Sequence, residues 1–163
     1  SGDIASNILY GNPDGSEAEM TEAATIAQAT EFIEQKKKKY KSTISQGGSN
    51  VSGGQKQRLS IARAIAKHPD IYIFDDSFSA LDYKTDATLR AKLKEKTSES
   101  TVMIVAQRIS TILHADQIIV LDDGQIVGKG THKELLKNCE AYYQIASSQL
   151  SENELEEDLK EVE

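Results

Sequence analysis

The residues with the clearest potential for chemistry start at Ser52 and continue through Gly53, Gly54 and Gln55. A serine followed three positions later by a glutamine is a capping-box pattern, so we expect a helix to begin here. The free amides and the positive dipole end of such a helix favour an anion, and the two glycines would let a phosphate approach the backbone closely. An ordinary, well-capped helix explains the same residues, and these positions alone leave both interpretations open.

A second candidate is the carboxylate pair Asp75 and Asp76, which follows a short apolar run at residues 71–74. An unbroken run of this length is typical of a strand that is buried on both faces of a parallel sheet. Ligands of open α/β sheets bind at the carboxyl ends of the strands, where this pair would lie. The alternative is a pair of aspartates that caps a helix or forms a turn.

The rest of the chain supplies the elements that would position these residues. Helices are expected at residues 16–29, 30–35, 52–67, 85–96, 110–113, 131–138 and 140–149, and strands at residues 71–74, 101–106, 117–121 and 126–130. A hairpin turn is expected at residues 122–125. Strands that alternate with helices indicate an α/β fold with a mostly parallel sheet.

Length and composition narrow the class of protein. The 163 residues are enough for one domain or a piece of one, and no stretch approaches the ~20 apolar residues of a membrane span. The single cysteine, Cys139, cannot form an internal disulfide, which fits a reducing, cytosolic setting. The net charge is −7, and residues 151–163 contribute −6 of it through seven acidic residues and Lys160. The remainder is near neutral and gives no support for nucleic-acid binding through bulk charge.

Three other features have less specific interpretations. The lysines at residues 36–39 form either a polyanion-binding patch or a solvated helix face or loop. The acidic residues 151–163 are expected to be disordered or to form a frayed helix. The three histidines are too scattered to predict a metal site, and His132 is expected in the first turn of a helix.

In order and spacing, these motifs resemble those of ABC-type ATPases. Residues 51–55 look like the signature motif, with Val51 where the family usually has leucine. Residues 71–75 look like the Walker B strand, and residues 79–82, which end in Asp82, look like the D-loop. Residues 1–11 are similar to the segment after the Q-loop in multidrug exporters, and the hairpin and helix of residues 122–132 resemble those that end the family's domain.

The resemblance implies a fold class and a domain organisation. The fold would be the C-terminal portion of a RecA-like, P-loop ATPase core together with an α-helical signature subdomain. Residues 1–68 would form that subdomain, residues 69–149 the part of the core, and residues 150–163 an acidic, disordered tail. The sequence contains no G-x-x-x-x-G-K-[ST] phosphate loop, which lies upstream in the family. The chain is therefore expected to be inactive when alone. A fragment of the core that lacks strands leaves sheet edges and apolar faces uncovered, so we also expect it to be unstable or prone to aggregation when alone.

The resemblance also assigns chemistry to the strand ends. Asp75 would help to hold Mg²⁺, and Asp76 stands where the family has a glutamate that positions or activates the attacking water. Gln107 stands in place of the switch histidine and cannot carry a proton at neutral pH. Both departures predict slow hydrolysis at this chain's own site, because general-base catalysis is worth ~10²–10⁴-fold. The alternative is that both are tolerated variants of an active site.

In this family, two domains enclose two ATP molecules, and each ATP lies between one domain's phosphate loop and the other domain's signature motif. By that resemblance, Ser52, Gly53 and Gly54, flanked by Val51 and Gln55, would contact ATP held by the partner. Asp82 would lie at the interface. An intact signature beside altered hydrolytic residues suggests the degenerate half of a heterodimeric exporter. A membrane domain upstream would hold it at the cytoplasmic face of the membrane, and no nucleic acid would be bound.

Two rival functions remain on sequence grounds. One is a soluble ABC-type ATPase that works on nucleic acid or ribosomes. Two features argue against it, namely the exporter-like residues 1–11 and the absence of a net positive charge. The other is a regulatory subunit that binds ATP without turning it over, with which Asp76 and Gln107 are compatible.

Overall fold

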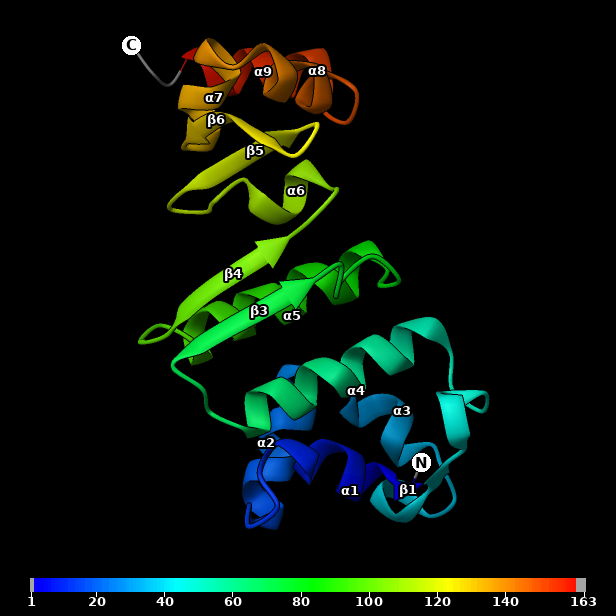
Figure 1. The fold of residues 1–163 in the computed structure, drawn as a ribbon. Helices are drawn as coiled ribbons and strands as arrows, with labels where there is room; N and C mark the ends of the chain where they lie inside the picture. Colours follow the sequence, from blue (N-terminus) through cyan, green and yellow to red (C-terminus); the bar gives the residue numbers. More distant parts are fainter. Residues whose placement is uncertain (1, 161–163) are drawn as a thin grey trace. The chain divides into compact units, whose positions relative to one another are not determined.

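The fold is described by a computed structural model, which covers residues 2–160. The chain divides into two compact units, Ser1–Val105 and Ala106–Glu163. Figure 1 shows their elements in chain order. The boundary that the sequence predicted after residue 68 falls inside the first unit, in the loop between a helix and a strand.

The first part of unit 1 is built mainly from helices. Its elements are β1 (Gly2–Asp3), α1 (Ile4–Ile8), η1 (Leu9–Gly11), α2 (Glu17–Ile26), α3 (Thr30–Glu34), η2 (Lys39–Lys41), β2 (Thr43–Ile44), η3 (Gln46–Gly48) and α4 (Gly53–Ala66). The short strands β1 and β2 pair in antiparallel fashion. The predicted helices α2, α3 and α4 are confirmed.

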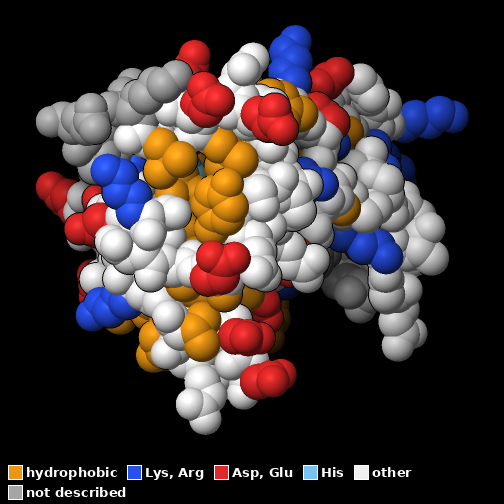
Figure 2. All heavy atoms as spheres, turned by 90° about the horizontal axis from the view of Figure 1, so that it is seen from above, with side chains coloured by type: hydrophobic (Ala, Val, Ile, Leu, Met, Phe, Trp, Pro, Cys, Tyr) orange, Lys and Arg blue, Asp and Glu red, His pale blue; other side chains and the backbone are white. Residues whose placement is uncertain are grey.

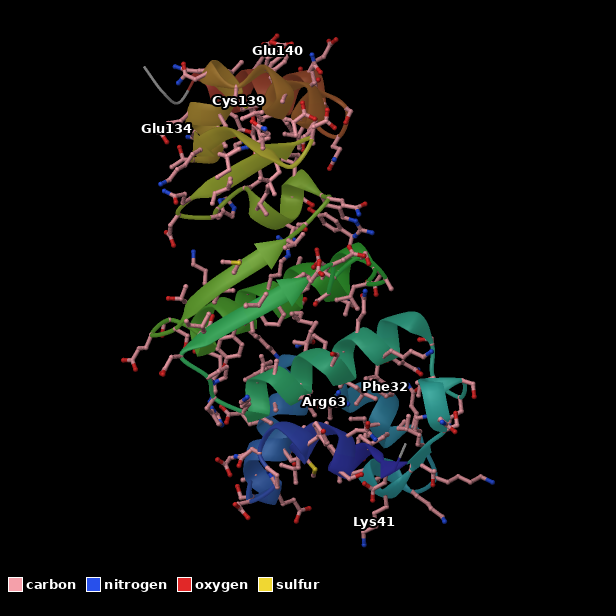
Figure 3. All side chains as sticks on the ribbon, viewed as in Figure 1. Phe32, Lys41, Arg63, Glu134, Cys139 and Glu140 are labelled. Atoms are coloured by element: carbon pink, nitrogen blue, oxygen red, sulfur yellow. The ribbon has the colours of Figure 1, made fainter. Side chains whose placement is uncertain are left out.

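Helix α4 packs against α1 and α2. It does so because its apolar residues recur at helical spacing, and Leu59, Ala62 and Ile65 are buried on one face. Polar contacts add to this packing. The guanidinium of Arg63 (Figure 3) donates from Nε to the carbonyl of Asn7 in α1 at 2.8 Å. These contacts fix the helix whose first residues are the candidate anion site.

The second part of unit 1 contains a parallel strand pair. Strand β3 (Ile71–Asp75) pairs in register with β4 (Thr101–Val105), and α5 (Tyr83–Lys96) connects them. Figure 1 shows α5 running along this pair. Tyr72 and Phe74 are buried in the same core as Leu89 and Leu93 of α5. Both strands and the crossover helix are thus confirmed.

The prediction that these strands are buried on both faces is wrong for the described residues. Ile71 and Ile73 are 61% and 67% exposed, and Met103 and Val105 are 56% and 53% exposed. The reason is geometric, because successive side chains point to opposite faces and α5 covers only one of them. Separately from these strands, the view from above in Figure 2 shows apolar side chains that gather between acidic ones on one face of the molecule.

Unit 2 consists of an antiparallel hairpin and four helices among the described residues. Its elements are α6 (Ile109–Ile112), β5 (Ile118–Asp122), β6 (Gln125–Gly130), α7 (His132–Asn138), α8 (Glu140–Ser147) and α9 (Glu152–Lys160). The predicted turn is confirmed, since Asp123 and Gly124 have positive φ angles, as tight hairpin turns require. Within the described residues, the only parallel pair is β3 with β4.

The acidic segment is a helix over most of its length. Helix α9 buries Leu155 against unit 2, and the carboxylate of Asp158 lies 3.1 Å from Nε2 of His132. Of the two expectations for this segment, a disordered tail or a frayed helix, the structure shows a helix up to Lys160 that packs on the rest of unit 2, and residues 161–163 lie outside the described residues. None of the helices in the described part of the chain is long and apolar enough to cross a membrane.

Candidate functional site

Ser52 caps the N-terminus of α4 as the sequence predicted. Its Oγ accepts a hydrogen bond from the backbone N–H of Gln55 at 3.2 Å, and Oε1 of Gln55 accepts one from the N–H of Ser52 at 3.1 Å. The dipole of this 14-residue helix places its positive end at Gly53 and Gly54. The capped helix is confirmed, and its use as an anion site stays a prediction.

The two residues beside the cap have different surroundings. Val51 is 9% exposed and belongs to the hydrophobic core, and its N–H donates to the carbonyl of Gly48 at 3.2 Å. Its side chain therefore serves packing. Gly53 is exposed, so the backbone at the start of the helix is open to a ligand.

Asp75 and Asp76 lie at the carboxyl end of β3. Asp75 is the last strand residue, and its carboxylate is exposed. The N–H of Asp76 donates to the carbonyl of Val105 at 3.1 Å. Asp76 has a φ of +45°, a left-handed conformation that aspartate adopts more readily than most residues. The carboxylates thus lie where ligands bind in this class of sheet, although Asp76 also belongs to a tight turn.

The turn after Asp76 fixes its carboxylate. Oγ of Ser79 lies 3.0 Å from Oδ2 of Asp76 and 3.2 Å from its carbonyl oxygen, so its one proton serves both acceptors. Oγ of Ser77 donates to the carbonyl of Asp75 at 3.2 Å. Asp76 is therefore oriented toward residue 79 by its own loop.

Asp82 ends this loop and caps the next helix. Its Oδ1 accepts a hydrogen bond from the N–H of Thr85 at 3.0 Å, at the start of α5. Hydrogen bonds from the side chain and the backbone of Thr85 lower the pKa of Asp82 below its ordinary value. Asp82 is thus held as an exposed anion whose position is fixed by the helix.

Gln57 joins the two parts of the site, and the sequence interpretation did not include it. Nε2 of Gln57 donates to the carbonyl of Asp76 and to Oγ of Ser79, each at 3.1 Å, and its Oε1 accepts from the N–H of Ala80 at 2.9 Å. The local sequence holds no signal for these contacts, because their partners lie 19 to 23 positions away.

Gln107 belongs to the second unit, and its side chain is exposed. Its carbonyl oxygen accepts a hydrogen bond from Nε2 of Gln149 at 2.9 Å, and Oε1 of Gln149 accepts one from the N–H of Ile109 at 2.9 Å. The side-chain amide of Gln149 thus fixes the segment that carries Gln107. Gln149 is a second positioning residue that the sequence interpretation missed.

The exposed carboxylate of Asp75 suits a hard cation such as Mg²⁺. No group of three or more His, Cys, Asp or Glu side chains in the described chain could hold a metal by itself. Mg²⁺ commonly takes one or two protein carboxylates and completes its shell with substrate phosphates and water. The residues present therefore fit Mg²⁺ bound together with a nucleotide, and Asp75 is the residue that would hold it.

Comparison with known proteins decides the family. The family model described as ABC transporter matches residues 4–79, which include Ser52, Asp75 and Asp76. An uncharacterized ABC transporter ATP-binding protein of Mycobacterium tuberculosis is 48% identical over 152 residues, which cover 91% of this chain and 26% of that protein. An ATP-dependent lipid A-core flippase of Photobacterium profundum is 43% identical, with 87% of this chain and 24% of that protein covered.

A solved structure agrees with these matches. A bacterial Atm1-family ABC exporter with ATP bound superposes with a TM-score of 0.87 at 35% identity, over 93% of this chain and 26% of that chain. The chain belongs to the ABC transporter family. The predicted fold class, an ABC-type ATPase, is thereby confirmed. This ABC chain spans about a quarter of the length of the curated relatives that it matches.

Proposed function

We propose that this chain is part of the ATP-binding motor of an ABC exporter, in which ATP binding and hydrolysis drive transport across a membrane. The observation that carries the proposal is the Ser52-capped start of α4, with Gly53 exposed beside the loop that leads to Asp82. Relatives that include a lipid A-core flippase and a putative multidrug export protein of Staphylococcus aureus, 42% identical, support an exporter.

The longer protein would supply what this sequence lacks. A transmembrane domain would hold the chain at the cytoplasmic face of the membrane, and a phosphate-binding loop would complete the chain's own ATP site. This chain alone would then not hydrolyse ATP. Residues 1–68 would form the helical subdomain, and residues from 69 onward would belong to the ATPase core.

A second nucleotide-binding domain would face this one. Ser52, Gly53 and Gly54 would contact the γ-phosphate of the ATP held by that partner, where the hydroxyl of Ser52 and the backbone amides of α4 stabilise its negative charge. Gln55 supports this contact by holding Ser52 in place. Asp82 would contact the partner across the interface.

The chain's own site would hydrolyse ATP slowly. Asp75 would hold Mg²⁺, which neutralises phosphate charge when bound. Asp76 has a shorter side chain than the family's glutamate, and Ser79 already engages its carboxylate. Gln107 can hydrogen-bond a phosphate but cannot supply a proton or a positive charge. We therefore infer a heterodimer in which this subunit acts mainly through the site that it completes for its partner.

Ser52→Arg in the full-length protein, purified with its partner, tests the borrowed site. The arginine side chain would occupy the space of the phosphate, so we expect ATP hydrolysis to fall by at least about tenfold while this subunit still binds ATP. Ser60→Arg, at an exposed position of the same helix, is the matched control. Equal loss in both variants would contradict the proposed role of Ser52.

Asp76→Asn tests the degenerate site. The substitution should lower total hydrolysis much less than the loss of the corresponding glutamate in the partner. An equal loss of hydrolysis in the two variants would overturn the proposal that this chain's own site is degenerate. If Asp76→Asn leaves hydrolysis unchanged while the loss of the partner's glutamate abolishes it, the rival function, an ATP-binding regulatory subunit, gains support.

A further inference from the structure

The side chain of Gln57 connects the signature helix to the loop that carries the acidic residues. Gln57 lies one helical turn after Gly53. It hydrogen-bonds to three residues of the loop, namely Asp76, Ser79 and Ala80, at distances of 2.9 to 3.1 Å. Gln57 as a whole residue is half-buried.

The partners fix the orientation of this carboxamide. The N–H of Ala80 can only donate, so it requires Oε1 of Gln57, and the carbonyl of Asp76 can only accept, so it requires Nε2. A glutamate would place an oxygen against the Asp76 carbonyl, and a methionine would satisfy neither partner. Glutamine is therefore the side chain of this length that satisfies both ends.

The loop that Gln57 holds is also the loop that determines the backbone conformation and the carboxylate orientation of Asp76. Ser79, which accepts a hydrogen bond from Gln57, donates to the carboxylate of Asp76. Asp76 itself has a φ of +45°, a left-handed conformation that persists where surrounding contacts enforce it. Gln57 supplies one of those contacts directly and another through Ser79.

We propose that Gln57 is a positioning residue that ties the start of α4 to the loop of residues 76–80. This inference rests on the proposed function, in which Ser52 contacts ATP held by the partner and Asp76 faces ATP held by this subunit. Through Gln57, nucleotide at the partner's site constrains the loop that leads to Asp76 and Asp82. Gln57 acts through these residues and does not itself touch nucleotide.

The test uses the full-length protein with its partner and the variant Gln57→Met, which keeps the length of the side chain and removes its hydrogen bonds. Loss of the tie between the loop and α4 should displace Ser52 and Asp82, which serve the partner's site, and so lower kcat for ATP hydrolysis about tenfold or more, because a ~1 Å misplacement can cost about 10²-fold. KM for ATP should change less than about threefold. Gln35→Met, at an exposed position of the same unit with no side-chain hydrogen bond among the described residues, should leave both constants unchanged.

Two further measurements separate positioning from a merely structural role. Ser79→Ala should be non-additive with Gln57→Met, since both act on the same loop. Gln57→Glu, which keeps the acceptor for Ala80 and loses both donated bonds, should also lower kcat. Additive effects, or an unchanged kcat in Gln57→Met while Ser52→Arg is inactive, would overturn this inference alone. An active Ser52→Arg would instead overturn the proposed function.

Discussion

The carbonyl oxygen of Ala80 occupies the space that a side chain at Gly54 would need. A Cβ at Gly54 would lie 2.9 Å from this backbone oxygen, whereas a Cβ at Gly53 would lie 3.6 Å from the Cβ of Ala80, an ordinary contact. The two positions of the motif therefore hold glycine for different structural reasons. Glycine is required at position 54 because the loop approaches α4 closely there. At Gly53, the lack of a side chain leaves the backbone at the start of the helix open to a ligand.

Gly54→Ala should destabilise the protein, and Gly53→Ala should not. Overlap with a backbone atom costs about 1–3 kcal/mol, while alanine in a helix is otherwise favoured over glycine by about 1 kcal/mol. Thermal unfolding of the intact protein, measured for both variants, checks this difference. Equal unfolding temperatures would show that the loop moves aside without cost.

The local features of this chain could be predicted because their causes lie within a few residues. The capping box at Ser52, the helix expected from residue 131 and the turn at Gly124 are confirmed, since each is set by side chains or by backbone freedom at neighbouring positions. Strand β3 was found from its apolar run. The burial of both its faces was predicted wrongly, because burial depends on what packs against each face.

The contacts that organise the candidate site could not be predicted from the pattern. Gln57 and Gln149 act through hydrogen bonds to residues far along the chain, and a glutamine has no periodicity that reveals its partner. His132 was expected only in a first helical turn. It is in fact buried, with Tyr142 on one ring nitrogen and Asp158 on the other.

Gly128→Ala should disrupt the packing of β6 on α7 and α8. A Cβ at this position would lie 2.6 Å from Sγ of Cys139 and 3.0 Å from Cδ2 of Leu135. Cys139, labelled in Figure 3, is 7% exposed and has little room to move. We expect a loss of about 1–3 kcal/mol in unfolding free energy.

The double variant of Gly128→Ala with Cys139→Ala controls this prediction. Removal of Sγ relieves the shortest contact, so the double variant should be more stable than the sum of the single effects predicts. Thermal unfolding of the four proteins gives the coupling. Strict additivity would mean that Gly128 is not constrained by the sulfur.

Asp158→Ala should loosen α9 from unit 2. The Asp158 carboxylate lies 3.1 Å from Nε2 of His132, whose side chain is almost fully buried, and Asp158 is itself half-buried. Loss of a hydrogen bond to a charged group costs about 1.5–3 kcal/mol, which corresponds to at least tenfold faster amide exchange in α9. Glu157→Ala, at an exposed position of the same helix, is the matched control and should leave exchange unchanged.

Tyr142 should make the stability of the protein fall at alkaline pH. Burial, with a further contribution from the charge of Asp158, raises the pKa of Tyr142 from its ordinary value of 10.0 to about 12. The folded state then holds this proton over a pH range in which the unfolded state has released it. The stabilisation is fully present below about pH 10 and is lost as pH rises toward about 12.

Comparison with Tyr142→Phe isolates this titration. Burial also raises the pKa values of Tyr40 and Tyr72, but these residues are present in both proteins and their effects cancel. Phenylalanine has no proton to lose, and it leaves Nδ1 of His132 without its 2.7 Å partner, so the variant should be the less stable protein at neutral pH. The difference in unfolding temperature between the two proteins should shrink between pH 10 and pH 12. A difference that stays constant over that range would show that Tyr142 ionises equally easily in the folded and unfolded states.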